Sequence, residues 1–394
     1  MTPGARAQAA IEILDQVIAA AADNAAAADT LIQRYFKTRR YAGSGDRRAI
    51  RELAYAAIRR AGERPESGRA ALIGLAQDRA EIAALFDGSP HAPAPMDAAE
   101  QPAAAGIAPA WLAGKLEAAI GADELPTLMA RAPLDLRVNR LRETREEVLR
   151  HFPGAEPGRH SPDALRLGEG VQIEAHPAFQ QGLVEVQDEG SQLIAAAARA
   201  QPEMTVVDLC AGAGGKTLAL AAAMAGEGRL IACDVDRQRL KRLPERAERA
   251  GVANVELRLL DGHREAAGLA DLVGQADVVL VDAPCSGTGT WRRNPEARWR
   301  LTPDRLARLI ALQDHVLALA APLVRPGGRL VYAVCSLLPD EGPERIAAFR
   351  HSQADWQADP EPIAAGRSVG DCRLLTPAHD QTDGFFIAAL TAPC

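Results

Sequence analysis

The 394-residue sequence predicts an α/β protein whose C-terminal half is a Rossmann-like, doubly wound parallel sheet. From residue 191 onward, short apolar runs typical of buried strands alternate with segments of helical periodicity. A glycine-rich turn follows the first of these strands, and two later strands each end in a loop that contains a cysteine. Alternation of this kind is typical of a parallel sheet, which binds its ligands at the carboxyl ends of its strands.

The spacing of apolar residues gives the order of elements in this half. We expect helices at 191–200, 217–224, 237–250 and 303–323, and strands at 205–209, 229–233, 255–259, 277–281 and 329–334. A last apolar run, 384–390, predicts an edge strand. We assign residues 188–394 to this domain.

Three further segments precede it. Residues 1–85 have apolar side chains at helical spacing and predict a small all-helical unit. Residues 86–109 are rich in proline and alanine, cannot build a core, and predict a linker. Residues 110–187 combine a helix with short alternating runs at 134–138, 164–167, 171–175 and 183–186, which predict a small α+β domain.

The composition is that of an ordinary soluble protein, with 47% apolar and 25% charged residues. The six cysteines have no paired spacing, so we expect free thiols, no disulfide framework and no metal site. The sequence shows neither a signal peptide nor an uncharged apolar run long enough to span a bilayer. We therefore expect a cytoplasmic protein without membrane segments, and we expect a monomer.

The basic segment 34–60 stands out against a net charge of −7. It contains nine Lys or Arg residues and two acidic residues, together with Tyr35, Phe36, Tyr41 and Tyr55. Basic side chains can neutralise phosphates and aromatic rings can stack on unpaired bases, which indicates RNA binding. An amphipathic helix with a solvated arginine face explains the composition equally well.

The turn after the first strand narrows the choice of cofactor. Its glycines let a ligand approach the backbone, and the helix that follows offers free N–H groups. A phosphate-binding loop needs glycine at position 210 and a dinucleotide fingerprint needs it at 217, but the sequence has Cys210 and Thr217. The turn consists of Cys210, Ala211, Gly212, Ala213, Gly214, Gly215 and Lys216.

Two acids complete this candidate cofactor site. Asp234 closes the second strand 20 residues after Gly214, where a carboxylate can hold both ribose hydroxyls of an adenosine cofactor. Asp261 follows the third strand and can accept from the adenine amine. A lone acid at a strand end is usually just solvated, but its position after this turn favours a ligand. S-adenosylmethionine fits, because its methionine carboxylate can lie at the turn without any phosphate.

Cys285 and Cys335 each follow a strand of the predicted sheet. Two thiols at the ligand-binding edge suit methylation of cytosine at carbon 5, which needs a nucleophile at carbon 6 and a second group to complete the reaction. Asp282 is placed to hold the N3/N4 edge of the base. A single cysteine is more often a buried apolar residue than a nucleophile, but two in matching loops favour the catalytic interpretation.

The motifs as an ordered set resemble the bacterial ribosomal RNA small-subunit methyltransferase B (Fmu/Sun) family and its NOP/NSUN relatives. They lie at 186–192, 208–217, 261–262, 282–287, 292–295, 334–336 with Glu341, and 383–386. The resemblance implies a class I methyltransferase domain at 188–394 that methylates RNA cytosine with S-adenosylmethionine. Residues 133–139 are similar to the start of the family's RRM-like domain, and 45–60 to its NusB-like RNA-binding domain.

The resemblance also implies residue roles. It makes Cys335 the nucleophile and Cys285 the group for product release, whereas DNA cytosine methyltransferases use the cysteine of the Pro-Cys loop as nucleophile. It places residues 210–216, Asp234, Asp261 and Asp282 at the cofactor, with Lys216 reaching Asp282 and the base. The sequence departs from the family pattern at three positions, Ala213 for proline, Gly190 for serine and Gly342 for asparagine.

Two other functions are weighed against this one. A DNA cytosine-5 methyltransferase would use Cys285 as nucleophile, but the sequence has no candidate target-recognition insert. A non-catalytic RNA-binding assembly factor would have no need of both cysteines and Asp282. RNA, most simply ribosomal RNA, is therefore the expected partner.

Overall fold

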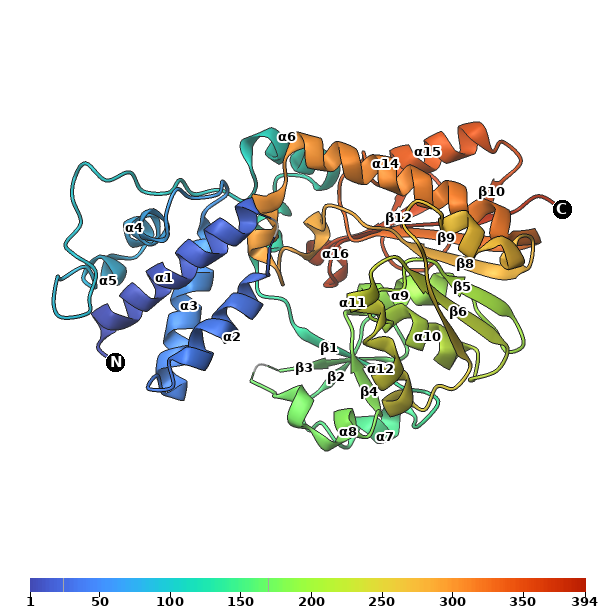
Figure 1. Ribbon diagram of the computed structural model, residues 1–394, viewed down its shortest axis with the longest axis horizontal. Coiled ribbons are helices and arrows are strands. Elements are labelled where there is room, and N and C mark those ends of the chain that lie inside the picture. Colours follow the sequence, from blue (N-terminus) through green and yellow to red (C-terminus); the bar gives the residue numbers. More distant parts are fainter. Residues whose placement is uncertain (24, 169) are drawn as a thin grey trace. The chain divides into compact units, whose positions relative to one another are not determined.

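The computed structural model describes residues 1–23, 25–168 and 170–394, and the chain divides into two compact units (Figure 1). One unit contains Met1–Arg131 and Thr290–Pro303, and we call it the helical unit. The other contains Ala132–Gly289 and Asp304–Cys394, and we call it the α/β unit. These units differ from the predicted domains, because residues 110–131 belong with the helices and a segment far along the chain returns to them.

The helical unit is built around three helices, α1 (Pro3–Ala22), α3 (Ser44–Arg60) and α4 (Gly68–Asp78). Their apolar faces form one core that includes Leu14, Ile50 and Leu72. Thr2 caps α1 by accepting a hydrogen bond from the N–H of Ala5 at 3.2 Å. The part of the unit before residue 132 also contains α2 (Ala28–Thr38), α5 (Ala80–Ala83), α6 (Ala110–Ile120) and the 3-10 helix η1 (Leu125–Met129).

The segment Thr290–Pro303 belongs to this unit and contains the 3-10 helix η5 (Pro295–Arg300). Its side chains hydrogen-bond to the ends of two helices of the unit. The buried guanidinium of Arg298 donates to the carbonyls of Ile58 at 2.6 Å and Ala61 at 2.8 Å, at the C-terminal end of α3. Glu296 accepts from the N–H of Ala28 at the first residue of α2. A cation at a helix C-terminus and an acid at an N-terminus both complement the helix dipole.

Residues 86–109, which we predict to be a linker, lie along the helical unit. Glu100 pairs with Arg69 of α4, with one bond of 2.8 Å, and the N–H of Ala103 donates to the carbonyl of Ala70 at 3.0 Å. The segment has no regular structure apart from a bridge between Ala105 and Ala61. These contacts fix the segment to the helical unit, so it is not a free linker.

The α/β unit begins with a four-stranded antiparallel sheet in the order β2-β3-β1-β4. Its strands are β1 (Leu134–Val138), β2 (Glu156–Pro157), β3 (Ala164–Leu167) and β4 (Val184–Val186). Two short helices, α7 (Arg145–Leu149) and α8 (Pro177–Gln180), complete it, and α7 starts with a capping box between Thr144 and Glu147. Within the run 171–175, which we predict as alternating, Ile173–Ala175 form a 3-10 helix, η2, and no strand.

The larger sheet has the predicted parallel core, in the order β11-β12-β13-β9-β8-β5-β6-β7. The parallel strands are β5 (Thr205–Asp208), β6 (Arg229–Asp234), β7 (Val255–Leu259), β8 (Ala276–Asp282) and β9 (Val324–Val334). Strand β13 (Phe385–Thr391) runs antiparallel to β9, so it is not the edge strand we predict. The strands beyond it are β12 (Cys372–Leu375), β11 (Arg367–Val369) and β10 (Gln357–Ala358), which pairs with β13.

Helices cover this sheet, with α9 and α10 on one side and α14 and α15 on the other (Figure 1). The predicted helix 237–250 is two helices, because Pro244 has no N–H to continue the first one. The helices are α9 (Glu189–Ala197), α10 (Gly215–Ala223), α11 (Arg237–Leu240), α12 (Leu243–Ala250), α13 (Glu265–Gly268), α14 (Pro303–Ala320), α15 (Pro343–Ser352) and α16 (Pro377–Asp380). Among the described residues one helical stretch, 303–323, is long and apolar enough to cross a membrane, as core helices of soluble proteins can also be.

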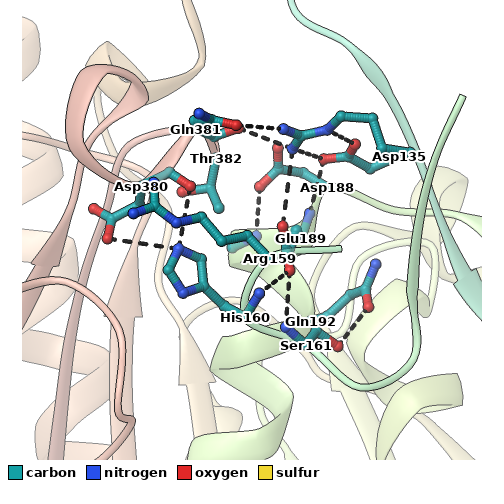
Figure 2. Close-up of polar contacts among 12 residues, drawn as sticks. Asp135, Arg159, His160, Ser161, Asp188, Glu189, Gln192, Asp380, Gln381 and Thr382 are labelled. Carbon is teal, nitrogen blue, oxygen red and sulfur yellow. Dashed lines mark hydrogen bonds and ion pairs between the residues drawn. The ribbon is translucent and has the colours of Figure 1, made fainter. Parts of the chain in front are cut away.

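A buried polar network joins the small sheet to the large one (Figure 2). Asp135 of β1 accepts two hydrogen bonds from Arg166, at 2.7 and 3.0 Å, and one from the N–H of Glu189 at 3.3 Å. Glu189 in turn accepts from the backbone of His160 and Ser161, at 2.5 and 2.8 Å. Arg166 also donates to the carbonyl of Gln381 at 2.9 Å, so the two sheets form one unit.

Candidate active site

The glycine turn and the two cysteine loops lie where the strand order of the large sheet reverses. From β5 the chain continues to β6 and β7 on one side, whereas β8 and β9 lie on the other. Loops that follow the two strands at such a reversal diverge and leave a crevice for ligands. The glycine turn follows β5, Cys285 follows β8, and Cys335 follows β9.

Two positions of the turn require glycine because of their backbone conformation or close packing. Gly212 and Gly214 have φ values of 56° and 84°, in the left-handed region that glycine adopts without strain. A Cβ on Gly214 would lie 2.2 Å from the side chain of Leu243. Gly214 is also the N-cap of α10, and no side chain in the described part of the chain caps that helix. The first N–H groups of α10 are therefore available to a ligand.

Asp234 is buried at the end of β6 and holds the turn in place. Its Oδ2 accepts from the N–H of Gly212 and its Oδ1 from the N–H of Asp236, both at 2.7 Å. Each oxygen retains a lone pair that can accept from a hydroxyl group. Asp261 is exposed in the loop after β7. Burial raises the pKa of the Cys210 thiol well above its ordinary value, so this cysteine stays neutral.

The two cysteine loops bring their sulfur atoms together. The Sγ atoms of Cys285 and Cys335 are 3.3 Å apart, close enough for a hydrogen bond between a thiol and a thiolate. The hydrogen bond to Cys335 and burial together raise the pKa of the Cys285 thiol well above its ordinary value. Both sulfurs can therefore reach one bound substrate.

Lys216 and Asp282 form an ion pair beside the thiols, with 2.7 Å between Nζ and Oδ2. Burial disfavours the ammonium form, but the Asp282 carboxylate outweighs it and raises the pKa of Lys216. Asp208 lies at the end of β5 and accepts a hydrogen bond from the Thr217 hydroxyl at 2.7 Å. Burial raises the pKa of Asp208 to about 7. Its Oδ1 has no hydrogen-bond partner among the described residues.

The structure adds a set of residues that the sequence argument gave no role, and we call it the Glu341 clamp. Glu341 is fully buried and accepts from the N–H of Ser286 at 2.8 Å and from Nε2 of Gln313 at 2.9 Å. It also accepts from the hydroxyl of Ser286 and from that of Ser336 at 2.5 Å. One signal could have revealed Gln313, since it lies in the buried stripe of α14 with Leu306, Val316, Leu317 and Ala320.

In the basic segment 34–60, two of the aromatic rings are buried, whereas most of the basic side chains are exposed as predicted. Tyr35 and Phe36 are 4% and 5% exposed in the helical core, so the prediction that these two rings stack on bases is wrong. Tyr55 is half-buried, and its hydroxyl donates to Asp29 at 2.8 Å. Tyr41 is 72% exposed. Exposed basic side chains remain at Arg34, Lys37, Arg40, Arg47, Arg48 and Arg51. A search of the described residues finds no group of three or more His, Cys, Asp or Glu side chains able to hold a metal ion.

Two solved structures are similar to this one in overall fold. The solved structure of PH0851 matches 99% of this chain and 99% of its own, with a TM-score of 0.78 and 25% identity. A methyltransferase homolog protein from Pyrococcus horikoshii matches 72% of this chain and 94% of its own, with a TM-score of 0.62 and 27% identity. These matches confirm the Rossmann-like α/β fold that the sequence predicts.

Sequence comparison identifies the family. The probable ribosomal RNA small subunit methyltransferase B of Synechocystis is 36% identical over 296 residues, which are 72% of this chain and 66% of that protein. The corresponding protein of Bacillus subtilis is 35% identical over 65% of this chain and 59% of its own. The family profile of 16S rRNA methyltransferase RsmB/F matches residues 195–391. The resemblance seen in the motifs is confirmed, and the chain belongs to the RsmB/F methyltransferase family.

Proposed function

We propose that the protein is an S-adenosylmethionine-dependent RNA (cytosine-5-)-methyltransferase that acts on ribosomal RNA. The observation that carries the proposal is the pair of sulfur atoms 3.3 Å apart, beside the Lys216–Asp282 ion pair and at the same sheet edge as the glycine turn. Carbon 5 of cytosine is a poor nucleophile, and a thiol that adds to carbon 6 overcomes this.

The thiols divide the reaction into two halves. The Cys335 thiolate forms a bond to carbon 6, and the electron pair of the C5–C6 double bond moves to carbon 5. This carbon would then bond to the methyl group, whose bond to the sulfonium sulfur breaks and leaves a neutral thioether. A base then takes the carbon 5 proton, the double bond returns, and Cys335 leaves as a thiolate. Cys285 assists this release. The order of the two thiols rests on the family resemblance.

Asp282 and Lys216 hold the base during these steps. The Asp282 carboxylate faces the N3/N4 edge of cytosine, where it favours protonation of the ring and so addition at carbon 6. Lys216, held 2.7 Å away, fixes the orientation of this carboxylate.

The residues around the turn fit S-adenosylmethionine, which when bound supplies a methyl group activated by a sulfonium. Residues 210–216, Asp234, Asp261 and Asp282 would hold it. The lone pairs left on Asp234 suit ribose hydroxyls, and the N-terminus of α10 suits a carboxylate. Lys216 is the one basic residue of the turn and is paired with Asp282, so it is not free to bind a phosphate as in a phosphate-binding loop.

The remaining parts of the chain serve RNA binding in this proposal. The helical unit acts as a NusB-like RNA-binding domain through the exposed basic residues of α2 and α3, and the small four-stranded sheet acts as an RRM-like domain. We propose a monomer that works in the cytoplasm.

Bisulfite sequencing of ribosomal and transfer RNA from a strain that lacks the gene tests the proposal. We expect one or more 5-methylcytosines of ribosomal RNA to disappear and to return when the wild-type gene is restored, but not with a Cys335→Ala variant. Loss of 5-methylcytosine from DNA alone would instead show a DNA methyltransferase. Unchanged RNA and DNA methylation, with RNA binding retained, would show a non-catalytic assembly factor.

A further inference from the structure

Two neighbouring strands bring the cysteines of the site together. Strands β8 and β9 are parallel and paired, with Asp282 in register with Ala333. Cys285 and Cys335 lie in the loops that directly follow these strands. Beyond the strands, the N–H of Gly289 still donates to the carbonyl of Cys335, at 3.1 Å. The loops therefore stay hydrogen-bonded to each other where the two sulfur atoms lie 3.3 Å apart.

The Glu341 clamp fixes the backbone next to both cysteines. Glu341 accepts hydrogen bonds from Ser286 and Ser336, the residues directly after Cys285 and Cys335. Gln313, which also bonds to Glu341, donates to the carbonyl of Pro284 at 3.0 Å. None of these hydrogen bonds involves a sulfur atom. The loops are therefore held in place while the thiols remain free to react.

The contact between the sulfurs is close to the geometry of a disulfide. A disulfide bond is about 2.05 Å long, so the two sulfurs have to approach by about 1.3 Å, a distance that rotation of the two side chains can supply. Both cysteines are half-buried, so a small oxidant can reach them. Since the loops hold the sulfurs together, bonding within the pair is favoured over bonding to a thiol of another molecule.

We propose that Cys285 and Cys335 are also a modification site, which a peroxide oxidises to a reversible disulfide within the chain. One sulfur, as a thiolate, attacks the peroxide; an S–O bond forms, the O–O bond breaks and one oxygen leaves as water. The other sulfur attacks the resulting sulfenic acid; the S–S bond forms, the S–O bond breaks and the second oxygen leaves as water. The two thiols lose two electrons and two protons, and hydrogen peroxide is reduced to two water molecules.

Oxidation of this pair would stop methyl transfer. Neither sulfur of a disulfide can add to carbon 6 of cytosine, so the oxidised protein is inactive until a thiol reduces the bond. This consequence rests on the proposed function, whereas the disulfide is a property of the protein alone. Disulfides of cytosolic proteins are usually transient and act in catalysis or redox sensing, which suits a bond that forms and breaks at the catalytic site.

Treatment of the reduced full-length protein with hydrogen peroxide, without RNA or methyl donor, tests the proposal. Catalase ends the reaction, N-ethylmaleimide blocks the remaining thiols in urea, and peptides are analysed by mass spectrometry without reduction. We expect one cross-linked pair of peptides, containing Cys285 and Cys335 and lighter by two hydrogen atoms than their sum. Four of the six thiols should remain, and dithiothreitol should restore all six.

The native fold should be what selects this pair. Peroxide treatment in concentrated urea is the control, because the unfolded chain also forms pairs that close shorter loops, such as Cys210 with Cys233. We expect the share of the Cys285–Cys335 pair among all disulfides to be at least about fivefold lower in urea.

Variants test the second step separately. In Cys285→Ser and Cys335→Ser the remaining sulfur has no partner, so its sulfenic acid persists and reacts with dimedone. We expect one or both variants to give at least about tenfold more dimedone adduct at that cysteine than the wild type. Cys394→Ser, which removes an exposed thiol near the end of the chain, is the matched control and should keep the cross-linked pair.

Two results would overturn the inference. One is a folded wild-type protein in which peroxide oxidises Cys285 or Cys335 without linking them. The other is a Cys285–Cys335 pair that is no more frequent in the native protein than in urea. A separate assay of methyl transfer to RNA, before oxidation and after reduction, tests the proposed function. A disulfide without any methyl transfer would refute only that function, and methyl transfer without a disulfide would refute only this inference.

Discussion

Replacing Asp234 with alanine should weaken the binding of S-adenosylmethionine by about 10- to 150-fold. Both carboxylate oxygens already accept a backbone N–H at 2.7 Å, which holds the carboxylate at the turn with one lone pair free on each oxygen. A buried hydrogen bond to a charged group contributes about 1.5–3 kcal/mol. Since 1.4 kcal/mol is tenfold in affinity, loss of a single ribose hydrogen bond gives the stated range.

Isothermal titration calorimetry measures this change, and Asp236→Ala is the matched control. Asp236 caps α11 by accepting from the N–H groups of Gln238 and Arg239, at 2.8 and 3.1 Å. Its loss should cost about 1 kcal/mol of folding stability. Both variants should thus unfold at lower temperature, but only Asp234→Ala should lose cofactor affinity. Wild-type affinity in a folded Asp234→Ala protein would refute this placement of the ribose, and so would an equal loss in Asp236→Ala.

Three further predictions concern stability and RNA binding. Burial raises the pKa of Asp208 to about 7, so this carboxyl group ionises at lower pH in the unfolded chain than in the folded protein. The free energy of unfolding should therefore fall between about pH 4 and 7, by an amount of the order of 4 kcal/mol. Urea unfolding of Asp208→Asn should lack this fall, and a pH profile like that of the wild type would contradict the prediction. Gly342→Ala should lower the free energy of unfolding by about 1–3 kcal/mol, because the added Cβ would lie 2.7 Å from the Phe386 ring. Thermal unfolding measures this change. Wild-type stability would show that the ring can move aside without cost. Glutamine at three exposed basic positions should weaken the salt dependence of RNA binding. The slope of log K against log salt concentration should fall in magnitude by about 2. An unchanged slope would show that the segment is only a solvated helix face. These positions are Arg34, Lys37 and Arg40.

The sequence is a good guide wherever one local pattern decides the structure. The expected strands 255–259 and 134–138 have the observed bounds, because period-two alternation and turn residues mark both ends. The loops after β5, β8 and β9 are predictable for the same reason. The strand bounds follow from burial, and the carboxyl ends of parallel strands meet at one edge.

Contacts between distant segments are where prediction from sequence fails. Nothing in the residue spacing of the segment Thr290–Pro303 shows that Arg298 binds the carbonyls at the end of α3. The aromatic residues near position 35 lie in a basic stretch, yet the amphipathic spacing of α2 buries Tyr35 and Phe36. Composition averages over a helix and does not say which face is solvated.

The same limit applies within the active site. Glu341 and Gln313 act through partners 55 and 29 residues away along the chain, at Ser286 and Pro284. The departure Gly342 also has a non-local cause. The Phe386 ring occupies the space that a side chain would need.

The central claim, that Cys335 attacks the base and Cys285 releases the product, is tested most directly by trapping the covalent complex. Each cysteine is replaced with alanine in turn, and the protein is incubated with S-adenosylmethionine and RNA that lacks the modification. A denaturing gel then shows any protein that remains bound to RNA. We expect Cys285→Ala to methylate RNA, stall before release and run as a cross-linked band, whereas Cys335→Ala binds RNA but gives no such band and transfers no methyl group. A cross-linked band in Cys335→Ala that is absent from Cys285→Ala would contradict the account and reverse the roles of the two thiols.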